Sequence, residues 1–216
     1  MRSLHDVYVR QAAWDGPEHW SGPPEMVERI AAITRPGPSD RVLDVGCGLG
    51  GPARRLAGLV GCTVVGVDVV EEVVRAAAAR DGAGARYAVA RAEHLPFSDA
   101  SVDQVWSLGA LAHVPDVATF AASIRRVLRP GGWVAVTEAF WDGRRGPRFR
   151  GTAPQPWRPV TAAEALSALS YAGLERASVM PWPGEGIPAL PPSDPALAAD
   201  LADGTLASRL IVARAP

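Results

Sequence analysis

Neither lysine nor asparagine occurs in the 216 residues of this chain, so arginine supplies all 22 basic side chains other than histidine. The absence of lysine excludes a Schiff-base nucleophile and the lysine of a P-loop, and the absence of asparagine excludes an N-glycosylation sequon. Glycine (22 residues) and proline (20 residues) are abundant, which fits the codon bias of a GC-rich gene. These absences narrow the chemistry without pointing to an activity.

The chain also has few cysteines and a small net charge. Two cysteines are too few for a disulfide scaffold, and 23 acidic residues balance the 22 basic ones to a formal net charge of −1. A chain without an overall positive field is not expected to bind nucleic acid. No apolar run approaches the length of about 18 residues that a membrane span needs, and the first ten residues lack the apolar stretch of a secretion signal. We therefore expect a soluble, cytoplasmic protein without membrane contact.

Short valine-rich runs alternate with longer stretches of helical periodicity, and this pattern predicts βα units in a parallel sheet. With 48% hydrophobic residues, the chain is long enough for one domain. Five runs bounded by Gly, Pro or Asp are expected to be buried central strands, and two more strands follow them. The five are 41–46, 63–68, 85–90, 102–108 and 133–138, and the two are 174–180 and 206–215.

Helices are expected between these strands. Thr161 and Glu164 have the spacing of a capping box, which indicates a helix over 161–173. The segment 180–201 contains too much proline and glycine for a regular element, so we expect a long surface loop there. The other expected helices are 52–60, 71–80 and 116–129, with 23–36 ahead of the first strand.

A glycine-rich turn joins the first strand to the first crossover helix. Gly46 and Gly48 fit the pattern GxGxxG together with Gly51, or GxGxG together with Gly50. Glycines let the backbone bend tightly and approach a ligand, while the helix N-terminus offers unpaired N–H groups. Such a turn binds cofactors of several kinds, so the glycines alone do not identify the ligand.

Two carboxylates near this turn distinguish between cofactors. Asp44 ends the first strand, where its charge would repel a pyrophosphate but attract the ammonium group of an amino acid. Asp68 ends the second strand, where a carboxylate can accept hydrogen bonds from both ribose hydroxyls. A nucleoside that carries an amino-acid tail satisfies both residues. The alternative is that both carboxylates only cap the strand ends.

With these motifs on residues 41–138, the sequence resembles the class I S-adenosylmethionine-dependent methyltransferases. The resemblance rests on VLDVGCGLGGPARRLA, GVDVVEEVV, ARAEHLPFSDASVDQVWSL, AHVPD and RVLRPGGWVAVTE, in the order and spacing of the family. The segments GGPARRLA and AHVPD are most similar to the small-molecule branch, which includes natural-product enzymes. The resemblance implies S-adenosylmethionine as the cofactor.

The same resemblance implies a fold and a division of the chain. The fold is an α/β, Rossmann-like three-layer αβα sandwich with a mostly parallel seven-stranded sheet whose last strand is antiparallel. Residues 1–216 would form one domain, in which 1–40 are an N-terminal lid and helical segment and 41–216 the core. Cover for the site would come from this lid with its aromatic residues, from the loop around Trp182, or from a second subunit, so a homodimer stays open.

The resemblance also assigns cofactor contacts. Gly46, Cys47 and Gly48 would line the methionine tail, Asp68 would hold the ribose, and Val69 would pack on the adenine face.

The adenine loop departs from the family, which usually has an aspartate where Arg91 stands. A guanidinium cannot accept a hydrogen bond from the adenine amine, so the Ala92 backbone or Glu93 would have to do so. Leu108, at the end of the fourth strand, would face the methionine with its carbonyl.

Two titratable residues follow the fourth and fifth strands, where ligands of parallel sheets bind. His113 could take a proton from a substrate hydroxyl, or it could only pack near the cofactor. Glu138 stands where related sugar O-methyltransferases carry an acidic residue, and it could orient or deprotonate a nucleophile or cap the strand.

The loop after the fifth strand is rich in arginine and aromatic residues and contains one acid, Asp142. Arg148 and Arg150 could pair with an anionic group of the substrate, and Trp141 could form part of an apolar wall. The alternative is a solvated loop.

These residues predict the transfer of a methyl group to oxygen or nitrogen of a small molecule, without a metal ion, because no cluster has metal-ligand spacing. Three alternatives remain open. The protein could use the fold for a non-methylating reaction such as a cyclisation, it could methylate RNA, or it could bind the cofactor without turnover.

Overall fold

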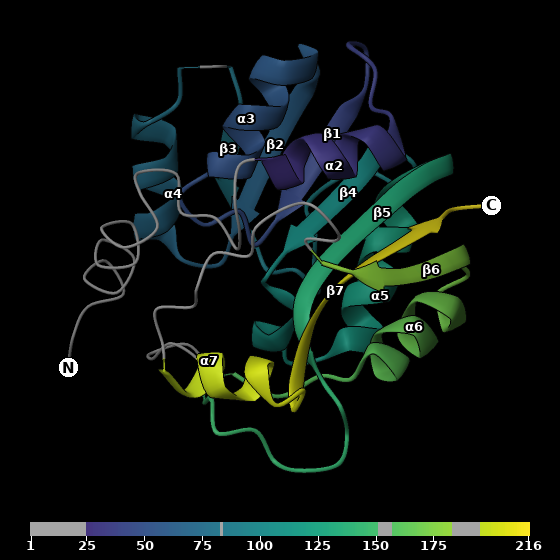
Figure 1. Ribbon diagram of the computed structural model, residues 1–216. Helices are drawn as coiled ribbons and strands as arrows, with labels where there is room; N and C mark the ends of the chain where they lie inside the picture. Colours follow the sequence, from purple (N-terminus) through teal and green to yellow (C-terminus); the bar gives the residue numbers. More distant parts are fainter. Residues whose placement is uncertain (1–24, 83, 151–156, 183–194) are drawn as a thin grey trace.

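In the computed structural model, which describes residues 25–82, 84–150, 157–182 and 195–216, a seven-stranded sheet lies between two layers of helices (Figure 1). The strand order is β3-β2-β1-β4-β5-β7-β6, and only β7 runs antiparallel to its neighbours. This confirms the expected three-layer sandwich. The strands are β1 (Arg41–Val45), β2 (Thr63–Asp68), β3 (Arg86–Val89), β4 (Val102–Leu108), β5 (Leu128–Trp141), β6 (Glu175–Pro181) and β7 (Leu206–Arg214).

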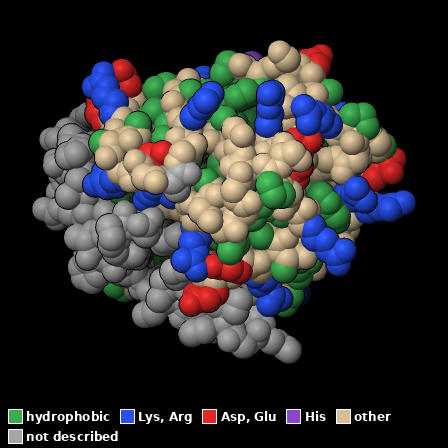
Figure 2. All heavy atoms as spheres, turned by 90° about the horizontal axis from the view of Figure 1, so that it is seen from above, with side chains coloured by type: hydrophobic (Ala, Val, Ile, Leu, Met, Phe, Trp, Pro, Cys, Tyr) green, Lys and Arg blue, Asp and Glu red, His purple; other side chains and the backbone are tan. Residues whose placement is uncertain are grey.

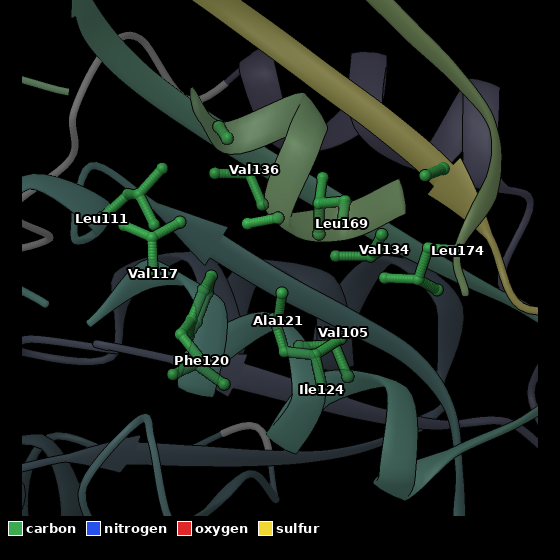
Figure 3. Close-up of a cluster of buried hydrophobic side chains, with 14 of the residues drawn as sticks. Val105, Leu111, Val117, Phe120, Ala121, Ile124, Val134, Val136, Leu169 and Leu174 are labelled. Carbon is green, nitrogen blue, oxygen red and sulfur yellow. The ribbon is translucent and has the colours of Figure 1, made fainter. Parts of the chain in front are cut away.

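Alternate residues of the central strands enter two separate cores. Val134 and Val136 of β5 pack under helices α5 and α6, whereas Ala135 between them faces α2 and α3. Figure 3 shows the first core, in which Phe120 of α5 lies against the sheet. Because the central strands are covered on both faces, they are valine-rich rather than alternating in polarity. The helices are α2 (Glu25–Thr34), α3 (Gly51–Val60), α4 (Glu71–Ala79), η1 (Leu111–His113), α5 (Val117–Val127), α6 (Ala162–Tyr171) and α7 (Pro195–Ala202).

Three sequence-based expectations are wrong in detail. Strand β3 is an edge strand with exposed and half-buried residues, not a buried central one, because it pairs with β2 at the end of the sheet. Strand β5 begins at Leu128 instead of residue 133. Gly132 permits this, since a Cβ there would lie 2.8 Å from the carbonyl oxygen of Asp103.

The third difference is α7, which lies inside the segment expected to be a loop. Proline is tolerated in the first turn of a helix, and Pro195 begins α7 before a run of alanine and leucine. Both glycines of that segment and most of its prolines fall in 183–194, outside the described residues. Within the part of the chain that the structure describes, every helix is too short or too polar to cross a membrane.

Helix α2 and Trp182 belong to the core rather than to a cover. Met26 and Ile30 of α2 are buried in the same cluster as Trp182, which is 7% exposed. Core packing therefore accounts for Trp182, and the proposed lid residues 1–24 lie outside the described chain. At α6 the Thr161 hydroxyl accepts a hydrogen bond from the amide of Glu164 (3.0 Å), which confirms this half of the capping box.

Candidate active site

The ends of β1 and β2 bring the glycine turn against Asp68. Val45 pairs with Val67 in parallel register, so the residue after β1 lies level with Asp68. The amide of Gly48 donates to Asp68 Oδ2 (3.1 Å), and the amide of Val70 donates to Oδ1 (3.0 Å). Both oxygens are thereby held in place, and each keeps a lone pair that a ribose hydroxyl could use.

The turn requires its glycines. Gly46, Gly48 and Gly50 have φ values of 76°, 52° and 76°, in the left-handed region that favours glycine. A Cβ at Gly46 would lie 2.3 Å from the Cβ of Ala110, so the turn also packs tightly against the segment after β4. The chain then enters α3, whose first amides are available to a ligand.

Asp44 is the clearest sign of a ligand. Its side chain is 3% exposed, and Oδ2 has no hydrogen-bond partner among the described residues. Burial and the nearby charge of Asp68 raise the pKa of Asp44 to about 7. A buried carboxylate without a partner is costly, and a cation that donates a hydrogen bond would relieve that cost. The site therefore fits the ammonium group of an amino-acid tail.

The remaining expected cofactor residues surround this pair. Cys47 is buried, and desolvation raises the pKa of its thiol well above the usual value, so it lines the site as a neutral group. Val69 is 52% exposed beside Asp68, as an apolar face for a ring would be. Leu108 at the end of β4 is half-buried.

The adenine loop has an internal ion pair. Arg91 lies 3.4 Å from Glu93, and the side chains are 55% and 9% exposed respectively. Ala92 between them is half-buried. The arginine that departs from the family therefore faces outward, and the carboxylate of Glu93 lies inward where an adenine amine could reach it.

His113 and Glu138 are brought together by the ends of β4 and β5. Glu138 Oε2 accepts a hydrogen bond from the amide of Ala112 in η1 (2.9 Å), and Oε1 accepts one from the amide of Ala139 (2.9 Å). Burial raises the pKa of Glu138. Burial raises the pKa of Asp68 as well, and the charge of half-buried His113 opposes the rise at both carboxylates.

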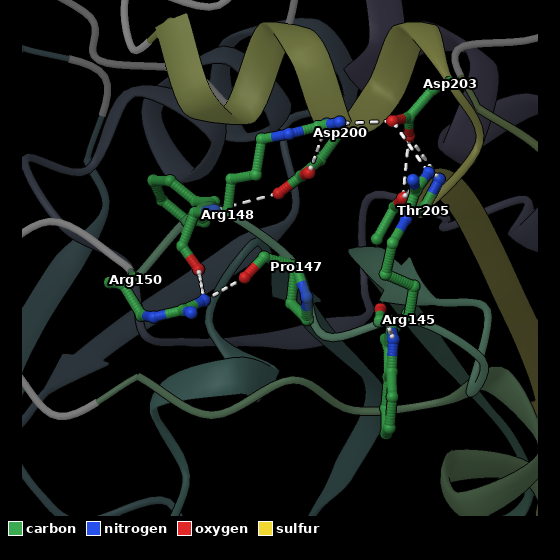
Figure 4. A network of polar contacts seen from close by, with 9 residues as sticks. Arg145, Pro147, Arg148, Arg150, Asp200, Asp203 and Thr205 are labelled. Atoms are coloured by element: carbon green, nitrogen blue, oxygen red, sulfur yellow. Dashed lines mark hydrogen bonds and ion pairs between the residues drawn. The ribbon is translucent and has the colours of Figure 1, made fainter.

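The arginine loop makes contacts that the sequence did not indicate (Figure 4). Arg148 Nη1 lies 3.0 Å from Asp200 Oδ1 and 2.8 Å from Asp203 Oδ2. Arg150 donates to carbonyl oxygens of its own loop, those of Pro147 and Phe149. Asp142 is the only acid within the loop sequence, whereas Asp200 and Asp203 are some fifty residues further along the chain.

The aromatic residues of this loop contact protein as well. The indole of Trp141 donates to the carbonyl oxygen of Arg145 (2.7 Å). The rings of Phe149 and Trp157 meet edge to face, with centroids 5.0 Å apart. The loop is thus an ordered part of the fold over its described residues.

One buried hydroxyl at the site escaped the sequence analysis. Thr137, immediately before Glu138, is 2% exposed, and its Oγ1 has no partner among the described residues. The alternation of side chains along β5 was the available signal, because it puts Thr137 and Glu138 on opposite faces. Within the same part of the chain, no group of three or more His, Cys, Asp or Glu is placed to hold a metal ion.

Comparison with known proteins agrees with this geometry. Residues 43–136 match a family described as a methyltransferase domain. The chain is similar to 2-methyl-6-phytyl-1,4-hydroquinone methyltransferase of Synechocystis sp., with 41% identity over 109 residues, which cover 50% of this chain and 34% of that protein. The chain thus spans about a third of this relative's length.

Two solved structures share the fold. Geranyl diphosphate C-methyltransferase from Streptomyces coelicolor A3(2), with Mg²⁺, geranyl diphosphate and S-adenosyl-L-homocysteine, has a TM-score of 0.73 and 20% identity, covering 88% of this chain and 77% of that one. The [4+2]-cyclase SpnF has a TM-score of 0.70 and 23% identity, covering 89% and 80%.

Proposed function

Because residues 43–136 are a class I S-adenosylmethionine-dependent methyltransferase domain, we propose that the whole protein transfers a methyl group to an oxygen or nitrogen atom of a small molecule. The observation that carries this proposal is the buried Oδ2 of Asp44, which lacks a hydrogen-bond partner among the described residues and lies near the ordered carboxylate of Asp68. Such an arrangement suits a zwitterionic nucleoside and not a dinucleotide, whose pyrophosphate Asp44 would repel.

Bound S-adenosylmethionine supplies a methyl group on a sulfonium that is a good leaving group. The protein therefore has mainly to hold and align its two ligands. In this proposal Asp44 holds the ammonium group, Asp68 holds the ribose, and Glu93 or the backbone of Ala92 meets the adenine amine. Gly46, Cys47, Gly48, Val69 and Leu108 line the remainder of the cofactor site.

His113 is proposed as the base when the acceptor is a hydroxyl. It is half-buried in η1, directly after β4, at the edge of the sheet where ligands of parallel sheets bind. Glu138 orients the turn that carries His113, since it accepts the hydrogen bond of Ala112. An amine acceptor would need the base less, because its lone pair is already free.

Small, natural-product-type acceptors are favoured over RNA. One relative is named for a hydroquinone and one structural neighbour contains geranyl diphosphate, which are both small molecules. Figure 2 shows that the arginine side chains on the face seen from above are scattered among acidic ones and form no continuous basic band. Nucleic-acid binding normally needs such a band.

Two parts of the proposal concern the whole chain. Residues 1–216 would act as one domain, with the part of the N-terminal segment 1–40 ahead of α2 as the lid, and a homodimer would add further cover. Sedimentation analysis with and without S-adenosylhomocysteine measures the second point directly.

A non-methylating reaction is the second candidate, because the [4+2]-cyclase SpnF has the same fold. Product analysis by mass spectrometry separates the two. Methyl transfer adds one methyl group and forms S-adenosylhomocysteine in equal amount, whereas a cyclisation forms product with neither change.

The cofactor assignment is tested first by calorimetry. We expect wild-type protein to bind S-adenosylhomocysteine and to ignore NAD⁺. Binding of the dinucleotide in place of the nucleoside would show that the assignment is wrong.

A further inference from the structure

Ion pairs join the arginine loop to α7 and the turn after it, and in these pairs arginine charges are balanced by aspartate charges. Arg148 bridges Asp200 and Asp203, and Arg145 adds a second ion pair to Asp203 Oδ2 (3.0 Å). Asp200 is fully buried, and its other oxygen accepts a hydrogen bond from the amide of Phe149 (2.8 Å). The loop is therefore fixed to α7 and to the turn that follows it by side-chain and backbone contacts together. We name these contacts of Arg145, Arg148 and Phe149 with Asp200 and Asp203 the clamp.

The far end of the same loop is fixed to the turn that carries His113. The amide of Arg158 donates to the carbonyl oxygen of Ala112 in η1 (2.9 Å), and the guanidinium of Arg158 pairs with Glu164 of α6 (2.7 Å). The edge-to-face contact of Phe149 and Trp157 joins the two ends of the loop. The aromatic pair thus lies between the clamp and η1.

The loop has few cations left for a ligand. Arg145, Arg148 and Arg158 are in ion pairs, and Arg150 donates to carbonyl oxygens of its own loop. Arg144 alone of the loop's five arginines has no side-chain partner among the described residues. A guanidinium already paired with carboxylates is a poor receptor for a further anion.

The surfaces beside the clamp are apolar. The described residues of α7 are alanine, leucine, one proline and Asp200, and the helix packs on β7. The start of β7 pairs with the end of β5, because Leu206 lies opposite Trp141. Helix α7 therefore stands at the carboxyl edge of the sheet (Figure 1). The turn η1 with His113 follows β4 directly and so belongs to the same edge.

We propose that Arg148 is a positioning residue, which locks α7 to the loop so that α7 and the Phe149–Trp157 pair form an apolar wall selecting a neutral, apolar acceptor. This inference rests on the proposed function, since the wall needs an acceptor to select. It replaces the role of Arg148 and Arg150 as receptors of an anionic substrate. Arg148 contacts no acceptor in this arrangement and acts through α7.

The clamp itself is tested by hydrogen exchange in the absence of any ligand. We expect Arg148→Gln to accelerate exchange of the α7 amides at least tenfold, and Asp203→Asn to do so to a lesser extent. Arg144→Gln is the matched control, because it removes an unpaired arginine of the same loop, and it should change nothing. Equal protection of α7 in Arg148→Gln and Arg144→Gln overturns the clamp.

The selection is tested with two probe series on protein saturated with S-adenosylhomocysteine. We expect 4-alkylphenols to bind more tightly as the chain lengthens, measured by saturation-transfer NMR, and the matched 4-alkylbenzoates to bind at least tenfold more weakly. Arg148→Gln should weaken the longer phenols about fivefold or more, whereas Arg148→Lys, which keeps an ion pair, should recover part of the loss.

The opposite outcomes overturn the inference. If benzoates bind better than phenols and Arg148→Gln abolishes that preference, the arginine is an anion receptor. If no phenol binds to the saturated protein, there is no apolar wall. Failure to bind S-adenosylhomocysteine at all would instead disprove the proposed function, and the exchange experiment would still report on the clamp.

Discussion

Two buried aspartates of this protein have opposite surroundings. Asp44 at the cofactor end has an oxygen with no partner among the described residues, whereas Asp200 of α7 has both oxygens paired, one with Arg148 and one with the amide of Phe149. Their exposed fractions, 3% and 0%, hardly differ. Burial alone therefore does not separate a binding residue from a structural one, but the pairing of each oxygen does.

The difference has an energetic consequence. The pKa of Asp44 rises from 3.8 to about 7 on folding, so the unfolded chain ionises more readily than the folded one. Ionisation of Asp44 therefore does not affect the free energy of unfolding below pH 4, but it lowers this free energy as the pH rises towards 7. Asp44 thus destabilises the unliganded protein at neutral pH. Asp200 differs, because both of its oxygens have partners.

The largest effect is expected at Asp68. Asp68→Ala removes the acceptor of the Gly48 and Val70 amides as well as the ribose ligand, so affinity for S-adenosylhomocysteine should fall at least about 100-fold, or roughly 3 kcal/mol. Titration calorimetry measures this. Glu72→Ala, which removes an exposed carboxylate of α4, should leave the affinity unchanged. A loss of less than tenfold in Asp68→Ala would mean that Asp68 only shapes the turn.

At Asp44 we expect a smaller loss of cofactor affinity together with a gain in stability. Asp44→Asn cannot ionise, so the unliganded variant should exceed wild type in stability by roughly 4 kcal/mol at pH 8 and lose this advantage at pH 4. Its affinity for S-adenosylhomocysteine should fall about tenfold. Urea unfolding at the two pH values and calorimetry check both points. A stability difference that does not depend on pH would contradict the assigned titration.

A local effect is expected at Glu138. Glu138→Gln has one oxygen for the two amides of Ala112 and Ala139, so exchange of the Ala112 amide should accelerate about tenfold. Affinity for S-adenosylhomocysteine should stay within about threefold of wild type. Residue-resolved hydrogen exchange provides the measurement. Unchanged protection of the Ala112 amide would show that Glu138 does not orient this turn.

The smallest effect is expected at Asp200. Asp200→Asn keeps an acceptor for the Phe149 amide but loses the charge that Arg148 meets, which should cost about 1–2 kcal/mol of stability. Affinity for S-adenosylhomocysteine should not change, in contrast with Asp44→Asn. Thermal unfolding and calorimetry measure the pair. If the cofactor affinity of Asp200→Asn fell as far as that of Asp44→Asn, the distinction between a binding aspartate and a structural one would be wrong.

Regular periodicity made most of the fold predictable. Strands 63–68 and 102–108 were predicted with their observed bounds, because a valine-rich run between Gly, Pro or Asp is a local signal. The exposure of β3 was not local, since it depends on which strand stands last in the sheet. Helix α7 was missed because its proline-rich surroundings concealed a short run of alanine and leucine.

The cofactor end was predictable for a related reason. Asp44, the glycines and Asp68 all lie within 25 residues, and parallel register fixes where they meet. The role of the arginine loop could not be predicted in the same way, because the partners of Arg145 and Arg148 come from α7 and the turn after it, more than fifty residues later. His113 and Glu138 were named from their positions after β4 and β5, while the hydrogen bond from the Ala112 amide to Glu138 became evident only in the fold.

The sequence by itself determined the βα order, the glycine turn and the carboxylates beside it, because each depends on residues close together in the chain. Only the tertiary structure decided which charges remain available to a ligand. That outcome depends on partners contributed by distant segments, and a buried charge is stable only when the folded chain, or a bound molecule, provides its counterpart.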